Sequence, residues 1–279
     1  MSLKISYIQE LFNIPHIADS PLIVFGLTVV VLSGSVWFGN AVLSKYRTKD
    51  TETSADLGII QTATLTLLGL IIGFTFSMAI ARYDMRQTYE ESEANAIGTE
   101  FLRADLLPSK NAEAVKSLLN NYLDQRILFY SKQNQETAKQ ITQRTIELEG
   151  ALWNEILPIA RTQSSPTIAL VVSGMNDVIN SHGYTQAAWW NRIPAAAWWL
   201  MAAIAIGANV LVGFGARNFK RNIGLFMIFP MMVSIAFFLI ADIDSPRGGV
   251  IRIDPRNLLD LKHNINPQTN INPSIGNRQ

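Results

Sequence analysis

The chain has 279 residues, of which 48% are hydrophobic and 16% are charged, and its formal net charge is +1 at pH 7. A charge balance this close to zero lacks the basic surplus typical of nucleic-acid-binding proteins, so we expect no nucleic-acid partner. The absence of cysteine excludes disulfides, thiolate metal sites and cysteine nucleophiles.

The first twenty residues predict an amphipathic helix. Ile5, Ile8, Leu11 and Phe12 recur at roughly helical spacing among polar and charged residues. Such a helix can lie on the membrane surface with its apolar face in the interface, or it can pack as an ordinary helix of an extramembrane part. We expect residues 1–20 to form the interfacial helix, with packing in the extramembrane part as the alternative.

Four stretches further along the chain carry no ionisable side chain, at 21–44, 57–81, 194–216 and 223–241. Each is close to the ~20 apolar residues that a helix needs to cross a bilayer. A charged group in hydrocarbon is costly, and backbone polar groups there must be satisfied within the segment, so uncharged runs of this length favour helices in lipid. The sequence therefore predicts an all-α, multi-pass cell-membrane protein, with spans one and two in 21–81 and spans three and four in 193–241.

The second span has no stop signal where its apolar run ends. From Arg82 to Leu107 there is no proline and only one glycine, and the segment is rich in good helix formers. A single helix over 57–107 would be about 75 Å long at 1.5 Å per residue, which is enough to cross the bilayer and to continue well beyond it.

Residues 82–192, between spans two and three, predict a helical-bundle extramembrane domain. Apolar residues recur at helical spacing, Pro108 and polar stretches separate the segments, and strand-like alternation is missing. The domain is too regular for a linker, so we expect several helices packed on one another. One predicted helix face contains Val115, Leu119, Tyr122, Arg126 and Phe129.

Residues 242–279 predict an exit turn and an extended polar tail. Two copies of Asn-Ile-Asn-Pro occupy 264–267 and 270–273, and neither a helix nor a central strand tolerates that spacing of proline and asparagine. We expect the chain after Arg256 to be an extended arm, which an oligomer could exchange between subunits.

Basic residues predict the orientation. The short loops 45–56 and 217–222 hold six lysines or arginines, and span parity puts both loops on one side of the membrane. Because cytoplasmic loops are enriched in Lys and Arg, we expect these loops in the cytoplasm and the helical domain on the opposite side.

The second span carries a stripe of small and polar residues at intervals of three or four positions, which places them on one helix face. This stripe is the candidate lining of an ion pathway. Gly69-x-x-x-Gly73 is also a pattern of close helix packing, so packing is the alternative. Phe74 and Phe76 could narrow a pore until it dewets, or they could be core aromatics. The candidate pore-lining residues are Thr62, Thr66, Gly69, Leu70, Gly73, Phe74 and Ser77.

Acidic residues follow the second span where its helix leaves the membrane. In an oligomer they would ring a vestibule and concentrate cations. Internal pairing with arginines is the alternative, since Glu100 and Arg103 are three positions apart. The candidate vestibule residues are Asp84, Glu91, Glu93 and Glu100.

Asp242 and Asp244 lie where the fourth span ends, ahead of Pro246 and the Gly248-Gly249 pair. Carboxylates at a helix exit can accept backbone amides or arginine side chains, or they can bind a hard cation such as calcium. Two acids are too few for a dedicated calcium site. We therefore expect turn capping with an arginine pair and no metal or cofactor, with a calcium ion as the alternative.

Several of these segments together resemble the bacterial bestrophin-like domain family, over roughly Leu57 to Asp254. The segments are Gly73-Phe74-Thr75-Phe76-Ser77, Arg82-Tyr83-Asp84-x-Arg86, Glu93-Ala94-Asn95-Ala96-Ile97-Gly98-Thr99, Arg103-Ala104-Asp105-Leu106-Leu107-Pro108, Tyr122-Leu123-Asp124-x-Arg126 and Asp242-x-Asp244-x-Pro246. The resemblance implies kinship with bestrophins, which are pentameric and mostly anion-selective channels whose second span lines a neck of apolar and aromatic side chains. Phe74 is the nearest analogue of a neck residue.

An enzymatic function has little support in the sequence. There is no Gly-x-Ser-x-Gly elbow and no phosphate-binding loop, and His16, His182 and His263 are far apart without ligand spacing. We expect a homo-oligomeric, pentameric ion channel whose partners are membrane lipids and inorganic ions. The alternative is a non-conducting, membrane-anchored scaffold or sensor that acts through its helical domain.

Overall fold

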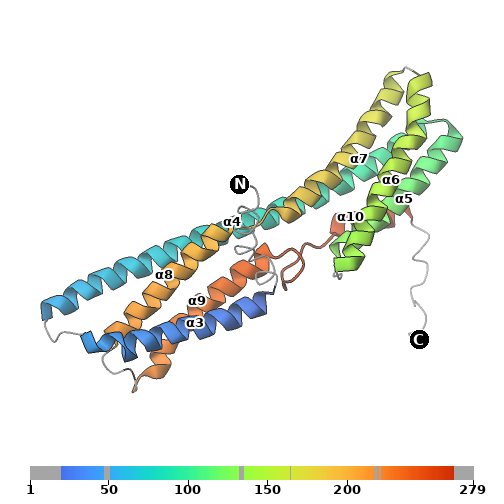
Figure 1. Cartoon of the computed structure of the whole chain (residues 1–279). Helices are drawn as coiled ribbons and strands as arrows, with labels where there is room; N and C mark the ends of the chain where they lie inside the picture. The colour runs from blue at the N-terminus through green and yellow to red at the C-terminus, as the bar shows by residue number, and fades with distance from the viewer. Residues whose placement is uncertain are drawn as a thin grey trace, which may run out of the picture. The chain divides into compact units, whose positions relative to one another are not determined.

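The computed structural model describes residues 20–46, 51–131, 135–163, 165–216, 219 and 221–266. The N-terminal helix predicted over 1–20 lies outside the described residues except for Ser20, and so does the second Asn-Ile-Asn-Pro copy. Every regular element of the described part is a helix, which confirms the all-α fold class (Figure 1). The elements are α3 (Pro21–Ala41), η1 (Leu43–Tyr46), α4 (Thr51–Arg103), η2 (Ala104–Leu106), α5 (Ser109–Tyr130), α6 (Gln135–Thr162), α7 (Pro166–Trp190), α8 (Ala195–Gly215), α9 (Ile223–Asp244) and α10 (Arg256–Ile265).

The chain divides into two compact units. The first, here called the membrane unit, comprises Met1–Tyr83 and Asn191–Arg252. The second, here called the extramembrane unit, comprises Asp84–Trp190 and Ile253–Gln279. Helix α4 contributes residues to both.

Among the described residues, four helices are long and apolar enough to cross a membrane, and each overlaps one of the four predicted spans. Helices α3, α8 and α9 have 21, 21 and 22 residues, or about 32 Å of helix, which matches the ~30 Å hydrocarbon core. Helix α4 has 53 residues and is therefore about 80 Å long, so only its uncharged run, 57–81, can lie in lipid. The continuous helix predicted here is confirmed, although it begins at Thr51, inside the expected loop 45–56, and ends at Arg103, where the short 3-10 helix η2 follows.

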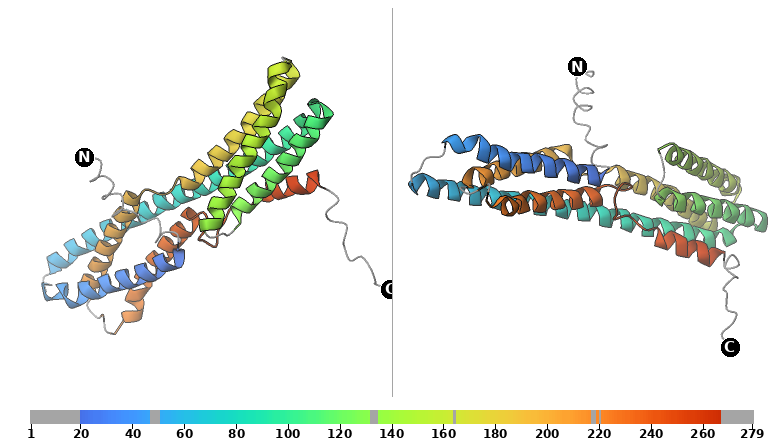
Figure 2. Two further views of the ribbon diagram at one scale, coloured as in Figure 1. Left: turned by 45° about the vertical axis from the view of Figure 1, so that its right-hand side comes forward. Right: turned by 90° about the horizontal axis from the view of Figure 1, so that it is seen from below.

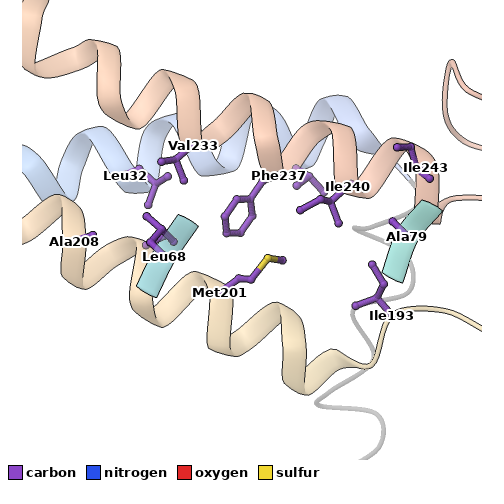
Figure 3. Close-up of a cluster of buried hydrophobic side chains, with 13 residues drawn as sticks. Leu32, Leu68, Ala79, Ile193, Met201, Ala208, Val233, Phe237, Ile240 and Ile243 are labelled. Atoms are coloured by element: carbon purple, nitrogen blue, oxygen red, sulfur yellow. The ribbon is translucent and has the colours of Figure 1, made fainter. Parts of the chain in front are cut away.

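A cluster of buried apolar side chains joins the four spans in the membrane unit (Figure 3). Met201 of α8 and Phe237 of α9 point into the space between their helices, and both are 3% exposed or less. Leu68 and Ala79 place one face of α4 in the same cluster. Because lipid is as apolar as these side chains, close packing rather than water exclusion holds the spans together.

Two glycines let the backbones of α3 and α8 meet. A Cβ atom on Gly39 would overlap the carbonyl oxygen of Val210, and one on Gly213 would overlap the carbonyl oxygen of Val36. The contact is reciprocal, and no flexible side chain is available to move aside. Small residues at such crossings allow the closest approach of helices in membranes.

The extramembrane unit is a helical bundle (Figure 2). Helix α5 packs against α6, α6 against α7, and α10 against α5. The insertion of a helical bundle between spans two and three is thus confirmed. Its buried apolar side chains include Val115, Leu119, Leu123, Leu152, Ile156 and Met175.

The prediction of an extended arm directly after Arg256 is wrong, because Arg256–Ile265 forms helix α10. The Glu90 carboxylate holds the first turn: Oε1 accepts the Leu258 amide at 3.0 Å, and Oε2 accepts the Asn257 side chain at 2.6 Å. Leu258 is fully buried. The Asn-Ile-Asn-Pro motif marks the end of this helix, since α10 stops one residue before Asn266.

Candidate functional site

The stripe on α4 is exposed along the membrane unit. Thr62, Thr66, Gly69, Gly73 and Ser77 are all exposed, and an added Cβ on either glycine would meet nothing within 4 Å. On the opposite face of this helix, in contrast, the buried residues are Leu68, Thr75 and Ala79. Within the described part of one protomer, therefore, the Gly69-x-x-x-Gly73 pattern does not pack two helices together.

The stripe offers oxygen dipoles without charge. The Thr62 hydroxyl donates to the Gly58 carbonyl at 2.8 Å, and the Thr66 hydroxyl donates to the Thr62 carbonyl at 2.9 Å. Each hydroxyl proton is thus used inside the helix, and the oxygen lone pairs remain as acceptors on the exposed face. Because 57–81 contains no charged side chain, this face of α4 presents only dipoles and apolar side chains.

Large apolar side chains flank the stripe. Phe74 is 61% exposed and Leu70 is 52% exposed. The alternative that Phe74 is a core aromatic is wrong for the protomer. Phe76 is 36% exposed and lies at the edge of the same surface.

The four candidate vestibule acids divide into two pairs. Asp84 and Glu91 are exposed. Glu93 and Glu100 are fully buried, so the prediction that they face a vestibule is wrong for these two. They lie on the face of α4 that packs inside the extramembrane unit, together with the fully buried Ile97.

Glu93 forms a buried ion pair with Arg126 of α5. Its Oε1 accepts the Arg126 Nε–H, and its Oε2 accepts Arg126 Nη2 at 3.2 Å, the Thr185 hydroxyl at 3.2 Å and the Tyr130 hydroxyl at 3.5 Å. Burial lowers the pKa of Arg126, but the Glu93 carboxylate more than offsets this and raises it above its ordinary value. Burial and the same carboxylate raise the pKa of Tyr130.

A second polar contact inside this unit was not expected from the sequence. His182 Nδ1 lies 2.8 Å from Glu149 Oε1, and the Tyr122 hydroxyl donates to the same oxygen at 3.5 Å. Burial is the main cause that raises the pKa of Tyr122, so this hydroxyl stays protonated and serves as a donor. The three side chains form a fixed hydrogen-bonded cluster in which His182 has a structural role.

Glu100 is buried without a hydrogen bond. Neither of its carboxylate oxygens has a hydrogen-bond partner among the described residues, and Arg103 Nη1 forms a long ion pair with Oε2 at 4.0 Å. Burial raises the pKa of Glu100 to about 8, while the charge of Arg103 lowers it and that of Asp177 raises it. Gly174 of α7 packs directly on the carboxylate, since a Cβ there would overlap Oε2.

The two acids at the end of α9 are used in hydrogen bonds to the backbone. Asp242 Oδ1 accepts the Val250 amide and Oδ2 accepts the Ile251 amide, both at 2.8 Å. Asp244 Oδ1 accepts the Ile193 amide at 3.1 Å. No group of three or more His, Cys, Asp or Glu side chains that could hold a metal ion occurs among the described residues. The carboxylates of Asp242 and Asp244 thus cap the turn, as predicted.

A family model described as the bestrophin-like domain matches residues 26–258. Because the match covers most of the chain, the chain belongs to the bestrophin-like family. The resemblance found in the sequence is thus confirmed. Together with the four apolar helices, family membership makes the chain a multi-pass membrane protein.

Solved structures share the fold. A bacterial bestrophin homologue from Klebsiella pneumoniae superposes with a TM-score of 0.60 at 14% sequence identity, covering 90% of this chain and 99% of that one. A variant of that homologue gives a TM-score of 0.61 at 12% identity, with 88% and 98% covered. Another variant gives 0.59 at 14%, with 90% and 99% covered. No curated protein sequence matches the chain.

Proposed function

We propose that the chain is a homo-oligomeric ion channel, a pentamer in which copies of α4 surround the pore. The observation that carries the proposal is the exposed stripe from Thr62 to Ser77 on a helix that crosses the membrane. Membership of the bestrophin-like family supports it.

Lipid tails are a poor covering for the polar face of α4. Hydroxyl oxygens and glycine backbone gain nothing from contact with lipid tails, where they have no water to bind. Around a central axis the same groups would face water and passing ions. Of the alternatives open from the sequence, packing within the protomer loses its support, because a Cβ added to Gly69 or Gly73 would meet no described atom within 4 Å.

Phe74 and Leu70 are proposed to form the narrowest part of the pore. Apolar side chains that converge on an axis can exclude water from a short segment and so close it to ions. No ionisable group is needed for this kind of gate, which fits the uncharged run 57–81.

Cysteine accessibility tests the pore lining directly, because the chain has no cysteine of its own. In planar bilayers, a water-soluble thiol reagent should change the conductance of Thr66→Cys and Ser77→Cys channels within seconds to minutes. Val30→Cys on α3, which is 70% exposed, should not respond, since we expect it to face lipid. Equal responses at all three positions, or none, would argue against the stripe as the lining.

Native mass spectrometry in mild detergent tests the assembly. A pentamer with conductance is expected. A monomer or dimer that carries no current would favour the membrane-anchored scaffold or sensor instead.

Phe74→Ala should increase open probability, and unchanged gating would remove Phe74 from the proposed gate.

A further inference from the structure

The turn that follows the fourth span presents apolar side chains to the outside. This exit turn, Ser245–Arg252, belongs to the membrane unit and begins where α9 ends at Asp244. Val250 is 85% exposed and Ile251 is 38% exposed. Moving such exposed apolar side chains from water into an apolar environment is favourable.

Hydrogen bonds fix the turn in this conformation. The Asp242 carboxylate accepts the amides of Val250 and Ile251. The Ser245 hydroxyl oxygen accepts the Gly248 amide at 3.0 Å, and Arg252 Nε donates to the Gly249 carbonyl at 2.8 Å. The exposure of Val250 is therefore built into the turn.

The exit turn lies at a boundary of the bilayer. The hydrogen bond from the Ile193 amide to Asp244 ties the end of the fourth span to the start of the third. Trp198 and Trp199 lie in the first turns of that third span, and Trp199 is 52% exposed. Tryptophans gather at the level of the lipid headgroups, which places the turn at the same level.

The charge around the tip suits an anionic surface. Arg247 and Arg252 flank the apolar tip, and the side chain of Arg252 is fixed beside it by its bond to Gly249. Asp242 and Asp244 are each 2% exposed, and their oxygens accept backbone amides, so they present little negative charge outward. We propose that the exit turn is a lipid anchor: Val250 and Ile251 enter the interfacial layer, and Arg252 binds the phosphate of an anionic phospholipid.

Depth-dependent quenching tests the insertion. Val250→Cys in the full-length protein, labelled with NBD, is reconstituted into phosphatidylcholine–phosphatidylglycerol vesicles that contain phosphatidylcholine with a nitroxide near the headgroup. The label should emit at shorter wavelength and be quenched by the nitroxide lipid. Leu102→Cys in the extramembrane unit, which is 71% exposed, is the control and should not be quenched. An unquenched label at position 250 would overturn the proposal, because it would show that the residue faces water or a neighbouring copy of the chain and not the lipid.

Lipid retention tests the charge contact. Native mass spectrometry of protein purified from mixed vesicles should show phosphatidylglycerol retained over phosphatidylcholine. One basic residue near an anionic surface contributes about a fivefold preference, so Arg252→Gln should reduce the retained phosphatidylglycerol by about that factor. Arg252→Lys should preserve most of it, and Arg144→Gln, an exposed arginine of α6, should leave it unchanged. Wild-type retention in Arg252→Gln would contradict the proposal.

Discussion

Glu93 and Arg126 form an ion pair in which both side chains are fully buried. Removing two charges from water is costly, and mutual attraction with additional hydrogen bonds offsets the cost only while both partners remain. Thr185 and Tyr130 supply such bonds to Glu93, and the Arg126 guanidinium lies 4.5 Å from the Phe129 ring centroid. Each of the two buried charges is therefore stable only while the other is present.

Replacing one partner of this pair is expected to be strongly destabilising. Arg126→Met leaves the Glu93 carboxylate buried without its counter-charge, which should lower the free energy of unfolding by about 3–5 kcal/mol. Thermal unfolding in detergent would show this as a large fall in Tm. Arg144→Met removes an exposed partner of Glu147 and should change Tm little. Similar Tm values for the two variants would show that Glu93 finds another partner.

Glu100 should make stability fall as the pH rises. Its pKa in the folded chain is about 8, against an ordinary value of 4.5, so between these values the folded state holds a proton that the unfolded state has released. The contribution of Glu100 to the free energy of unfolding is therefore fully present below about pH 4.5. It decreases between about pH 4.5 and 8 and is lost above about pH 8, a total change of a few kcal/mol. Glu100→Gln, with no titrating proton, should flatten the decline of Tm between pH 5 and 9. An unchanged slope would show that Glu100 gains a compensating charge on folding.

At the scale of the helices, the close crossing of α3 and α8 predicts that a larger side chain at Gly213 weakens their packing. Gly213→Val puts side-chain atoms against the backbone of Val36, which cannot rotate away. Forcing extra carbon atoms into a packed contact typically costs about 1–3 kcal/mol, so the variant should unfold at lower SDS concentration. Gly26→Val on α3 is the matched control, because nothing lies within 4 Å of its added Cβ. Equal unfolding of both variants would mean that α3 and α8 separate without difficulty.

The spans could be predicted from the sequence because lipid excludes charge. The uncharged run 194–216 and helix α8, Ala195–Gly215, agree within a residue or so. Helix α10 was not predicted because the residues that stabilise it are remote in the sequence. The Leu258 amide donates to Glu90, which lies 168 positions earlier. The two glycines at the α3–α8 crossing were missed for the same reason.

The candidate site was predictable only in part. The spacing of Thr62, Thr66 and Gly73 was enough to place them on one face, and that face is exposed. It was harder to predict which acids of α4 are exposed and which are buried, since Glu91 and Glu93 are only two positions apart on one helix. Glu93 is buried because it pairs with Arg126, which lies 33 positions further along the chain. The signal that was available was Arg126 itself, a charge in the middle of an apolar helix face.

At the scale of the whole molecule, the exposed acids predict a dependence of conductance on salt. Asp84 and Glu91 continue the face of the stripe at helical spacing, and in the proposed oligomer their carboxylates would raise the local cation concentration. Asp84→Asn with Glu91→Gln should lower potassium conductance at ~30 mM salt by more than about twofold. The difference should vanish near 1 M salt, where the screening length is ~3 Å.

The matched control for this measurement is Glu113→Gln, which neutralises an exposed carboxylate on α5. Its conductance should equal that of the unaltered channel at both salt concentrations. If the double variant conducts potassium as well as the control at low salt, Asp84 and Glu91 do not face the conduction path.

The meeting of Gly39 and Gly213 also constrains how the protein is made. These residues are 174 positions apart in the chain, and at about 5–20 residues per second the ribosome needs roughly 10–35 s to translate that interval. During this time helix α3 is already in the bilayer, while α8 has not yet been synthesised. The contact between α3 and α8 therefore cannot form during this interval. Until α8 has been inserted, α3 must be surrounded by lipid or bound by the insertion machinery.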